Sequence, residues 1–364
     1  MKIKDFIDYE QPNEYIVESD RYSSKYSTPV LTAGHSFILG YINENNGIYK
    51  KGPCIIFDDF TTSVHYVDFP FKVKSSAMKI LTAKSNADLK YCYYLLLSLS
   101  NMPPNHKRQW ISTTSEKNHL LPSIDKQISI VKQLDLISGT IANYTNQIEN
   151  LNNLVKARFI ELFGTVRENP YKYPTATLKE VCHKITDGKH GGCEQEENSG
   201  YYYIGAREIY DGEIHYDTAP QIKYTDFSKD YRRCNIEQGD MVIVNTGATI
   251  GKSAIASSSL TERTLLQKSV ALIKVKPNII SAEFLRYCYM ANPSMYMVES
   301  ASAQPNLLLS KINTTVIYLP PMDLQLQFAD FVQQVDKSKL AVQQSLEKTQ
   351  LLFDSLMQEY FGEN

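Results

Sequence analysis

The segment most suggestive of chemistry is the glycine-rich stretch 247–253, with the sequence GATIGKS. It ends in Gly-Lys-Ser like a phosphate-binding loop, but such a loop has four residues between its two glycines, and here only three intervene. Residues 254–259 favour strand or loop, so no helix N-terminus follows to bind a phosphate. The pattern disfavours nucleotide binding and indicates either a hairpin tip presenting Thr249 and Lys252 or an ordinary glycine turn.

A second group of potential ligands is the cluster Cys182, His183, His190 and Cys193, which spans twelve residues. Thiolates and imidazoles are the usual ligands of zinc. Zinc sites normally present closely spaced ligand pairs on both sides, whereas adjacent residues such as Cys182 and His183 point in different directions. The six cysteines of the chain contain no CxxC pair, which is typical of reduced, buried thiols. We therefore expect no bound metal.

The elements that position these groups follow from an internal repeat. Residues 121–164 recur without a gap as residues 319–362, which lie 198 positions later. Nine of the 44 aligned pairs are identical, among them Gln127 with Gln325. A repeat this long and this widely spaced does not fit a solenoid, so it indicates two copies of one larger unit, each a globular part followed by a long helix.

Both copies of the repeat have the apolar spacing of a one-sided helix. Each begins after Leu-Pro and stops at Phe-Gly, where glycine can close a helix in the left-handed conformation. This predicts two helices of about 40 residues and about 60 Å each. We expect them to pair antiparallel within one molecule, burying both apolar strips; the alternative is that both strips pair with other chains. In the first copy the apolar residues are Leu134, Ile137, Ile141, Tyr144, Ile148, Leu151, Val155 and Leu162.

The globular parts have the pattern of mixed α/β domains, in which short β-branched and aromatic runs are broken by Gly, Asn and Asp. Runs 54–57 and 241–244 occupy matching places, and so do the helix-like runs 88–93 and 284–289. The duplication therefore covers the globular parts as well. The predicted division is a domain at 1–120, a helix at 121–164, a domain at 165–318 and a helix at 319–364.

Composition places the chain among water-soluble proteins. The 364 residues carry a net charge of −2, begin without an apolar signal region, and have their longest apolar run at 91–97. That run is far too short to cross a bilayer. We expect a cytoplasmic protein without contact to a membrane.

The order of parts resembles a known family. A globular domain, a helix beginning LPxxxxQ, a second globular domain and a helix beginning LPPxxxQ resemble the DNA-specificity subunit of type I restriction-modification enzymes. The segment Ser302-Ala303-Gln304-Pro305-Asn306-Leu307 adds to the likeness. The resemblance implies two target-recognition domains, each reading half of a split target in double-stranded DNA. The first domain departs from the pattern, because it is about 30 residues shorter than the second.

The resemblance also implies partners. The paired helices would hold the two domains at a fixed distance and dock methyltransferase subunits, two in number, with restriction subunits completing the complex. S-adenosylmethionine, ATP and Mg would then bind to partner chains and not to this one. The sequence agrees, because it has no Asp/Asn/Ser-Pro-Pro-aromatic motif for a flipped base and no Glu-x-Lys pair of the nuclease kind. We expect a non-catalytic subunit.

The resemblance further suggests which residues face DNA. Segment 185–190 resembles the loop that opens a recognition domain, and the hairpin tip of 247–253 and scattered basic residues supply more donors. Lys and Arg contact phosphates, whereas Arg, Asn and Gln can read base edges. Taken singly, a charged residue of this kind is more often an ordinary solvated side chain than a DNA contact, so the candidates form a ranked list. The DNA-binding candidates are Lys107, Arg108, Gln109, Thr186, Lys189, His190, Arg207, Thr249, Lys252, Lys268, Gln304 and Asn306.

Two other functions remain open from the sequence. One is a coiled-coil adaptor with no role on DNA. The other is the recognition part of a single-chain methyltransferase-nuclease. The start at Met1 and the stop soon after Gly362 favour a separate subunit over the second.

Overall fold

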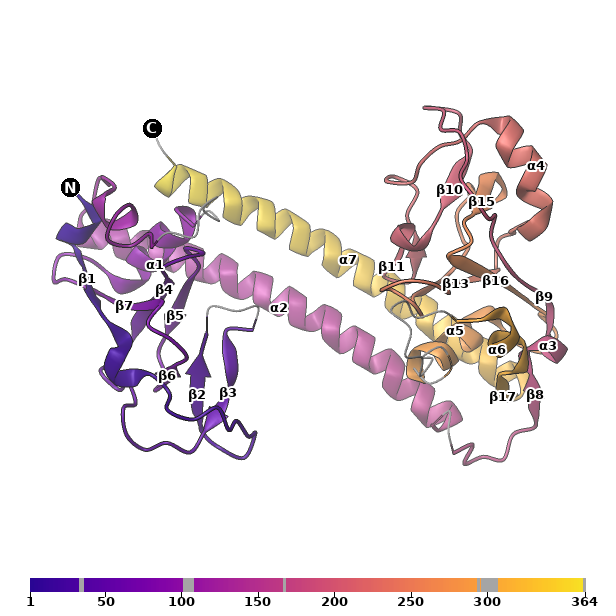
Figure 1. Cartoon of the computed structure of the whole chain (residues 1–364), viewed down its shortest axis with the longest axis horizontal. Helices are drawn as coiled ribbons and strands as arrows, with labels where there is room; N and C mark the ends of the chain where they lie inside the picture. Colours follow the sequence, from indigo (N-terminus) through magenta and orange to yellow (C-terminus); the bar gives the residue numbers. More distant parts are fainter. Residues whose placement is uncertain (33–35, 101–107, 166–167, 293–294, 296–306, 363–364) are drawn as a thin grey trace. The chain divides into compact units, whose positions relative to one another are not determined.

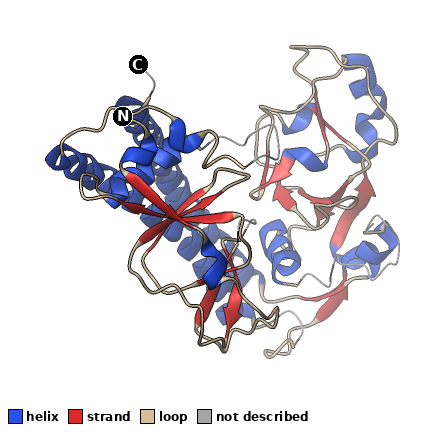
Figure 2. Cartoon of the chain, turned by 60° about the vertical axis from the view of Figure 1, so that its left-hand side comes forward, coloured by secondary structure: helices blue, strands red, loops and turns tan. Residues whose placement is uncertain are grey.

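The computed structural model describes residues 1–32, 36–100, 108–165, 168–292, 295 and 307–362. The chain divides into two compact units. Unit 1 contains Met1–Asn146 and Gln343–Asn364, and unit 2 contains Gln147–Val342. Strands and short helices form the globular part of each unit, and the two long segments are helical (Figure 2). The predicted mixed α/β class is confirmed.

Unit 1 is built on a four-stranded antiparallel sheet of order β1-β7-β4-β5. The central strand β4 is buried along its whole length, and its alternate side chains enter two different cores. Ile55 and Phe57 face the core that contains helix α1, whereas Cys54 and Ile56 face a second core beside a small sheet. The elements are β1 (Ile7–Glu10), β4 (Cys54–Asp58), β5 (Val64–Val67), β7 (Met78–Ala83) and α1 (Leu89–Ser98) (Figure 1).

The small sheet of unit 1 has the order β3-β2-β6. Strand β2 pairs antiparallel with β3 and parallel with β6. Its elements are β2 (Thr28–Leu31), β3 (Ile38–Ile42) and β6 (Lys72–Val73). Short 3-10 turns in this unit are η1 (Ile3–Asp5), η2 (Pro12–Tyr15) and η3 (Thr114–Glu116).

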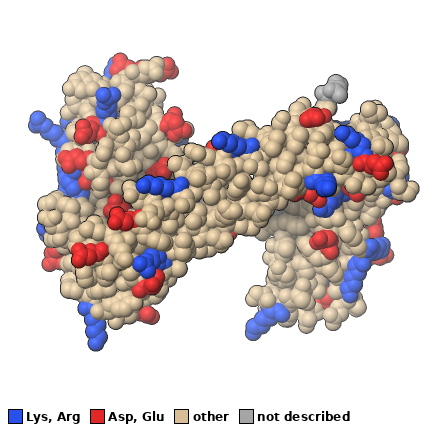
Figure 3. Space-filling view, turned by 180° about the vertical axis from the view of Figure 1, so that it is seen from behind, with Lys and Arg blue, Asp and Glu red and all other residues tan. Residues whose placement is uncertain are grey.

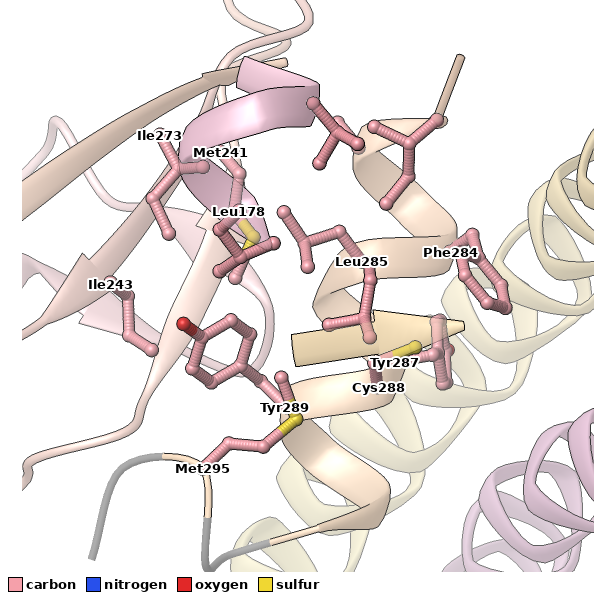
Figure 4. Packing of buried hydrophobic residues seen from close by; sticks show 14 of the residues in the cluster. Leu178, Met241, Ile243, Ile273, Phe284, Leu285, Tyr287, Cys288, Tyr289 and Met295 are labelled. Atoms are coloured by element: carbon pink, nitrogen blue, oxygen red, sulfur yellow. The ribbon is translucent and has the colours of Figure 1, made fainter. Parts of the chain in front are cut away.

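Unit 2 repeats the main sheet with the order β14-β13-β16-β9, again antiparallel throughout. Strands β9, β13, β14 and β16 thus match β1, β4, β5 and β7, and helix α5 matches α1. Met241 and Ile243 of the central strand enter the core around α5, shown in Figure 4, while Val242 and Val244 enter a second core. The elements are β9 (Cys182–Asp187), β13 (Met241–Val244), β14 (Ser253–Ile255), β16 (Val270–Val275) and α5 (Ala282–Ala291).

Unit 2 has further elements around this sheet. Strands β10 and β15 pair parallel, as β2 and β6 do in unit 1. Helix α4 has no counterpart among the described residues of unit 1. The elements are β8 (Thr175–Thr177), α3 (Leu178–Val181), β10 (Tyr202–Ile204), η4 (Ala206–Glu208), β11 (Ile209–Tyr210), β12 (Glu213–Ile214), α4 (Tyr224–Cys234), η5 (Thr261–Arg263), β15 (Thr264–Leu266), α6 (Leu309–Thr314) and β17 (Val316–Tyr318).

The two long helices are α2 (Ile124–Phe163) and α7 (Met322–Phe361), each of 40 residues as the spacing predicts. In unit 1 the start of α2 shares a core with the end of α7, through residues such as Leu134 and Phe361. In unit 2 the end of α2 shares a core with the start of α7, through Phe163 and Phe328. The expected antiparallel pairing within the molecule is confirmed in each unit separately. Gly164 closes α2 with a φ of 73°, whereas Gly362 follows α7 without a left-handed φ.

A buried glutamine fixes the start of each long helix. The amide nitrogen of Gln127 donates to the Pro122 carbonyl at 2.8 Å, and its oxygen accepts from the backbone N–H of Asp88 at 2.8 Å. Gln325 makes the same pair of bonds to Pro320 and Ser281, both at 2.9 Å. Asp88 and Ser281 are the N-caps of α1 and α5. The glutamine of the LPxxxxQ motif therefore ties the beginning of each long helix to the beginning of the adjoining domain helix.

Candidate nucleic-acid interface

Several loops of unit 2 meet at one end of its main sheet. Because β9 and β13 both run antiparallel to β16, the end of β9 at Asp187 and the end of β13 at Val244 lie beside the start of β16 at Val270. Backbone bonds then join the loops directly. Asn245 donates to the Ser269 carbonyl at 3.0 Å, and the N–H of Lys268 donates to the Lys189 carbonyl at 3.0 Å.

Strand β10 brings a further loop to the same place. The N–H of Gln267 donates to the carbonyl of Ile204, the last residue of β10, at 2.8 Å. The turn that carries Arg207 follows directly. We call residues 187–190, 205–207, 245–252 and 267–269 together the loop end of unit 2.

The glycine-rich stretch is a hairpin connection, as one of the two sequence interpretations holds. It joins β13 to β14, with the Val244 N–H bonded to the Lys252 carbonyl at 2.8 Å and the Gly251 N–H bonded to the Val244 carbonyl at 2.9 Å. Gly247 and Gly251 have positive φ of 104° and 89°, which their lack of a side chain permits. A strand follows the stretch, so no helix N-terminus is aimed at a phosphate there. Thr249 is half-buried and Lys252 is exposed.

The predicted loop at 185–190 differs from expectation in two positions. Thr186 lies inside strand β9 and pairs with Leu272 of β16, so it is not part of a turn. Lys189 forms an ion pair with Asp230 of α4 at 2.7 Å, and its side chain is only 14% exposed. The partner that neutralises this lysine is 41 positions away in sequence, which is why local spacing did not reveal it.

The third residue of that prediction, His190, is exposed and contacts a small charge network. Its Nε2 lies 2.8 Å from Oδ2 of Asp187, whose other oxygen binds the Arg233 guanidinium. Arg233 also donates through Nε to the carbonyl oxygens of Asp187 and Gly188, at 3.0 and 2.9 Å. Burial alone would raise the pKa of Asp187, but the bonds from Arg233 and His190 hold it below its usual value. Arg233 thus fastens the end of β9 to α4.

Three predicted cations remain free for an anionic ligand. Arg207, Lys252 and Lys268 are exposed, and none forms an ion pair with a carboxylate in the part of unit 2 that the structure describes. They sit on three separate loops of the loop end. Flexible cationic side chains on loops held by a rigid sheet suit contacts with phosphates.

In unit 1 the predicted residues have different environments. Arg108 is exposed, but Gln109 is only 9% exposed, and its backbone N–H binds the carbonyl of Asp59 at 2.9 Å. Gln109 is therefore placed as a structural residue at the end of this unit's sheet. Lys107, Gln304 and Asn306 lie outside the described residues.

The Cys and His cluster does not come together as a ligand set. Cys182 is buried, and burial raises the pKa of its thiol to about 12, which disfavours the thiolate that a metal binds. Cys193 is partly exposed. Among the described residues no group of three His, Cys, Asp or Glu side chains is arranged to hold a metal ion. The described residues also contain no helix long and apolar enough to span a membrane.

Sequence reasoning missed the residues that join the loops. Asn245 is 5% exposed, and its carbonyl accepts from the Leu307 N–H at 2.7 Å, which brings the end of segment 302–307 to the loop end. A lone asparagine or glutamine after a strand carries no sequence signal for this role. Arg233 was visible as one of the basic residues of the second domain, but its bonds to the end of β9 were not.

The surface carries no single dominant charge on the face shown in Figure 3, where Lys and Arg are interspersed with Asp and Glu. Comparisons with known proteins give the family of the chain. The sequence profile of a family described as "Type I restriction modification DNA specificity domain" matches residues 170–351, which is half of the chain. The chain belongs to this family.

One specificity subunit is similar to part of this chain. The EcoR124I/EcoR124II specificity subunit of Escherichia coli is 46% identical over 153 residues. The match covers 38% of this chain and 38% of that protein, so it spans well under half the length of the relative.

Solved structures show the fold over the whole length. The S subunit of a type I restriction-modification system from M. genitalium has a TM-score of 0.64 at 17% identity, covering 100% of this chain and 96% of its own. A chain from a study of complex assembly in the type I R-M system has a TM-score of 0.53 at 15% identity, covering 98% and 97%. At these identities the likeness concerns the fold alone.

Proposed function

We propose that this chain is a sequence-specific DNA-recognition subunit of a type I restriction-modification complex, with each unit reading one half of a bipartite target. The observation that carries the proposal is the loop end of unit 2. It places exposed Arg207, Lys252 and Lys268 on three loops at one end of a rigid sheet, within the segment that matches the specificity-domain family. Cations of this kind bind phosphates, while neighbouring polar side chains can read base edges.

The net charge of the chain does not oppose this proposal. Residues 1–120 hold 14 Lys and Arg against 12 Asp and Glu, and residues 165–318 hold 17 of each. Residues 319–364 hold seven acidic side chains against three basic ones. The acidic excess therefore belongs to the C-terminal helix segment, while the globular domains are neutral to slightly basic. Phosphate repulsion from the net charge is weak at the proposed DNA-facing loops, because surface charges are screened beyond about 8 to 10 Å.

In the proposed complex the paired helices α2 and α7 set the spacing between the half-sites and dock two methyltransferase subunits, and restriction subunits join them. Methyl transfer with S-adenosylmethionine and ATP-driven cleavage with Mg belong to those partners. The hairpin form of the GATIGKS stretch supports this division, because it lacks the helix that would bind a nucleotide phosphate. The proposed place of action is the cytoplasm.

The proposal is tested by mapping DNA methylation in cells with and without this gene, in the presence of the partner subunits. We expect one bipartite motif to lose methylation when the gene is removed. A second strain carries residues 165–318 from a relative in place of its own. That exchange should change one half of the motif and leave the other half intact.

Other outcomes separate the remaining hypotheses. An unchanged methylome in a strain with active partners would support an adaptor without a DNA role. A change in both halves of the motif would contradict independent reading by the two units. Methyl transfer by the purified chain in the absence of partner subunits would show that it is an enzyme itself.

A further inference from the structure

Units 1 and 2 have matching backbone hydrogen bonds at the same end of their sheets. The N–H of Asp58 binds the Ser63 carbonyl at 2.9 Å, as the N–H of Val244 binds the Lys252 carbonyl. These bonds close the β4–β5 hairpin in unit 1 and the β13–β14 hairpin in unit 2. We call residues 58–63, 75–77 and 108–110 the loop end of unit 1.

Two further bonds complete the match and set Asp59 opposite Asn245. Asp59 donates its N–H to the Ala77 carbonyl and accepts the N–H of Gln109 at its own carbonyl, at 3.0 and 2.9 Å. Asn245 makes the same two bonds to Ser269 and Leu307, at 3.0 and 2.7 Å. The two units thus share a backbone frame in which one residue after the central strand joins two other loops.

The side chain at this shared position differs between the units. Asp59 is 1% exposed, and its Oδ1 accepts the N–H groups of Gln109 at 3.0 Å and Trp110 at 2.8 Å. Its Oδ2 lies 3.2 Å from Nζ of Lys79, which is fully buried. Lys79 also donates to Oε1 of Gln11 at 3.1 Å and to the Ser76 carbonyl at 3.3 Å. The Asp59 and Lys79 pair therefore contacts three segments: the one after β1, the one before β7, and the one that contains Gln109 and Trp110.

Among the residues of unit 2 that the structure describes, no ion pair lies at this place. Strand pairing sets Lys79 opposite Phe57 in β4, and it sets Ala271 opposite Ile243 in β13. A neutral asparagine and an alanine thus stand where unit 1 has two opposite charges. Taking two charges out of water costs free energy, and their attraction offsets only about that cost, so the pair adds little net stability. We therefore explain it by the chain segments that it holds in place.

We infer that Asp59 is a positioning residue for the first half-site: its carboxylate holds the backbone at Gln109 and Trp110, and thereby Arg108, against the β4–β5 hairpin tip, while Lys79 neutralises the charge. This inference rests on the proposed function. Arg108 is exposed and directly precedes the two bonded N–H groups. A guanidinium reads a base edge only when its backbone is held in register with the groove.

The inference assigns the effect to the hydrogen-bond acceptor of Asp59 and not to its charge. Two double variants, both without the charge, separate these roles. In the double variant Asp59→Asn with Lys79→Ala, the side chains match those of unit 2, and an oxygen acceptor remains for the two N–H groups. In Asp59→Leu with Lys79→Ala, a side chain of similar size fills the space but accepts no hydrogen bond. Only the second variant should release Arg108 from its place.

The experiment uses the full chain assembled with its methyltransferase subunits and a DNA library in which each half-site is randomised in turn. Bound DNA is sequenced to give the discrimination at each half-site. We expect Asp59→Leu with Lys79→Ala to lose about tenfold or more in discrimination at the first half-site, comparable to one base contact. The second half-site should be unaffected, and Asp59→Asn with Lys79→Ala should stay close to wild type at both.

Trp110 gives a reading of the folded state, because it is the only tryptophan of the chain and is 1% exposed. Its emission should stay that of a buried ring in Asp59→Asn with Lys79→Ala. For the leucine variant the folded state is read from circular dichroism, because Trp110 itself loses its bond to Asp59 there. If the leucine variant unfolds unit 1, Asp59→Glu replaces it. That change keeps a charge for Lys79 but displaces the acceptor by one methylene, and it should weaken discrimination at the first half-site alone.

Each outcome has a defined meaning. Wild-type discrimination at the first half-site in a folded leucine or glutamate variant would overturn the inference. An equal loss at both half-sites would also overturn it, since the effect would not be local to unit 1. A wild-type complex that discriminates at neither half-site would contradict the proposed function itself, which keeps the two failures apart.

Discussion

The loop ends of units 1 and 2 share one backbone frame but carry different side chains. In unit 2, Lys252 and Lys268 are exposed on the hairpin and on the turn before β16. In unit 1 the hairpin place of Lys252 is taken by Ser63. Among the described residues, the cations at this loop end are Arg108, which is exposed, and Lys79, which is buried and paired with Asp59. The comparison shows that the frame which positions the loops can be retained while the groups offered to a ligand change.

The loops also differ in length. The hairpin connection spans residues 59–63 in unit 1 and residues 245–252 in unit 2. Unit 2 adds helix α4, which binds the end of β9 through Lys189 with Asp230 and through Arg233 with Asp187. Extra length and an extra helix give unit 2 more surface at its loop end, so we expect the two units to read different half-sites.

The largest expected effect is on the spacer of the DNA target and comes from lengthening the two long helices that connect the globular domains. Seven residues inserted in both helices, between Glu149 and Asn150 and between Glu347 and Lys348, keep the apolar seam in register and add about 10 Å to each helix. With base pairs rising by about 3.4 Å, the unread spacer should grow by up to about three base pairs. Methylation mapping of the variant strain measures this, and both half-site sequences should be unchanged.

The matched control inserts two residues at the same two places. Two residues rotate the apolar strip away from its partner, so this variant should lose activity. A folded seven-residue variant that still methylates sites with the original spacer would show that the helices do not set the distance.

A smaller effect is expected on the free energy of unfolding, because the hydrophobic cores of the two units differ in aromatic packing. Phe163 is fully buried against Phe284 and Phe328, with ring centroids 4.8 and 5.5 Å away. At the matching position in unit 1, Phe361 is 6% exposed and packs on Tyr91 at 5.3 Å. We expect Phe163→Ala to cost about 3 to 5 kcal/mol and Phe361→Ala about 1 kcal/mol less. Urea denaturation measures both, and a greater loss for Phe361→Ala would reverse the ranking.

The glutamine bonds test whether the two units are stabilised in the same way. Gln127→Ala leaves the N–H of Asp88 and the carbonyl of Pro122 without their buried partner, at a cost of about 2 to 4 kcal/mol. Gln325→Ala should cost about the same in unit 2. Because Trp110 reports on unit 1, its fluorescence transition in urea should shift more for Gln127→Ala. Equal shifts would mean that the two units unfold as one.

The smallest expected effect concerns single charges at the loop ends. Lys252→Ala with Lys268→Ala should remove two phosphate contacts, lowering the slope of log affinity against log salt by about 1.8. Ser63→Ala with Ser76→Ala changes the hairpin and turn positions of unit 1 and should leave the slope unaltered. The DNA affinity of the assembled complex is measured at salt concentrations from about 50 to 200 mM. An unchanged slope in the lysine variant would place both residues away from DNA.

Local sequence patterns predicted the central strand of unit 2 and both long helices with good accuracy. The run 241–244 is strand β13 with the same bounds, and both long helices start and stop within a few residues of the Leu-Pro and Phe-Gly signals. These features depend on neighbours one to four positions apart, which the sequence displays directly. The shared position of Gln127 and Gln325 was visible in the repeat, although their hydrogen bonds were not.

The ligand-facing residues were harder to predict, because exposure depends on residues far away in sequence. Lys189 was expected on a DNA-facing turn, but it is paired with Asp230. Gln109 was expected to face DNA, but it is nearly buried and held by Asp59, 50 positions earlier. Arg207, Lys252 and Lys268 were also expected to face DNA, and these three residues are exposed.

The sequence by itself therefore determined the duplication, the two 40-residue helices and the runs that form the central strands, since apolar period and turn residues act over a few positions. Only the tertiary structure decided which cations are free and which are neutralised. It also revealed that a buried Asp59 and Lys79 occupy the place of Asn245 and Ala271. Pairing and burial arise when strands and loops distant in the chain are brought within about 3 Å, and no local pattern records which of them will meet.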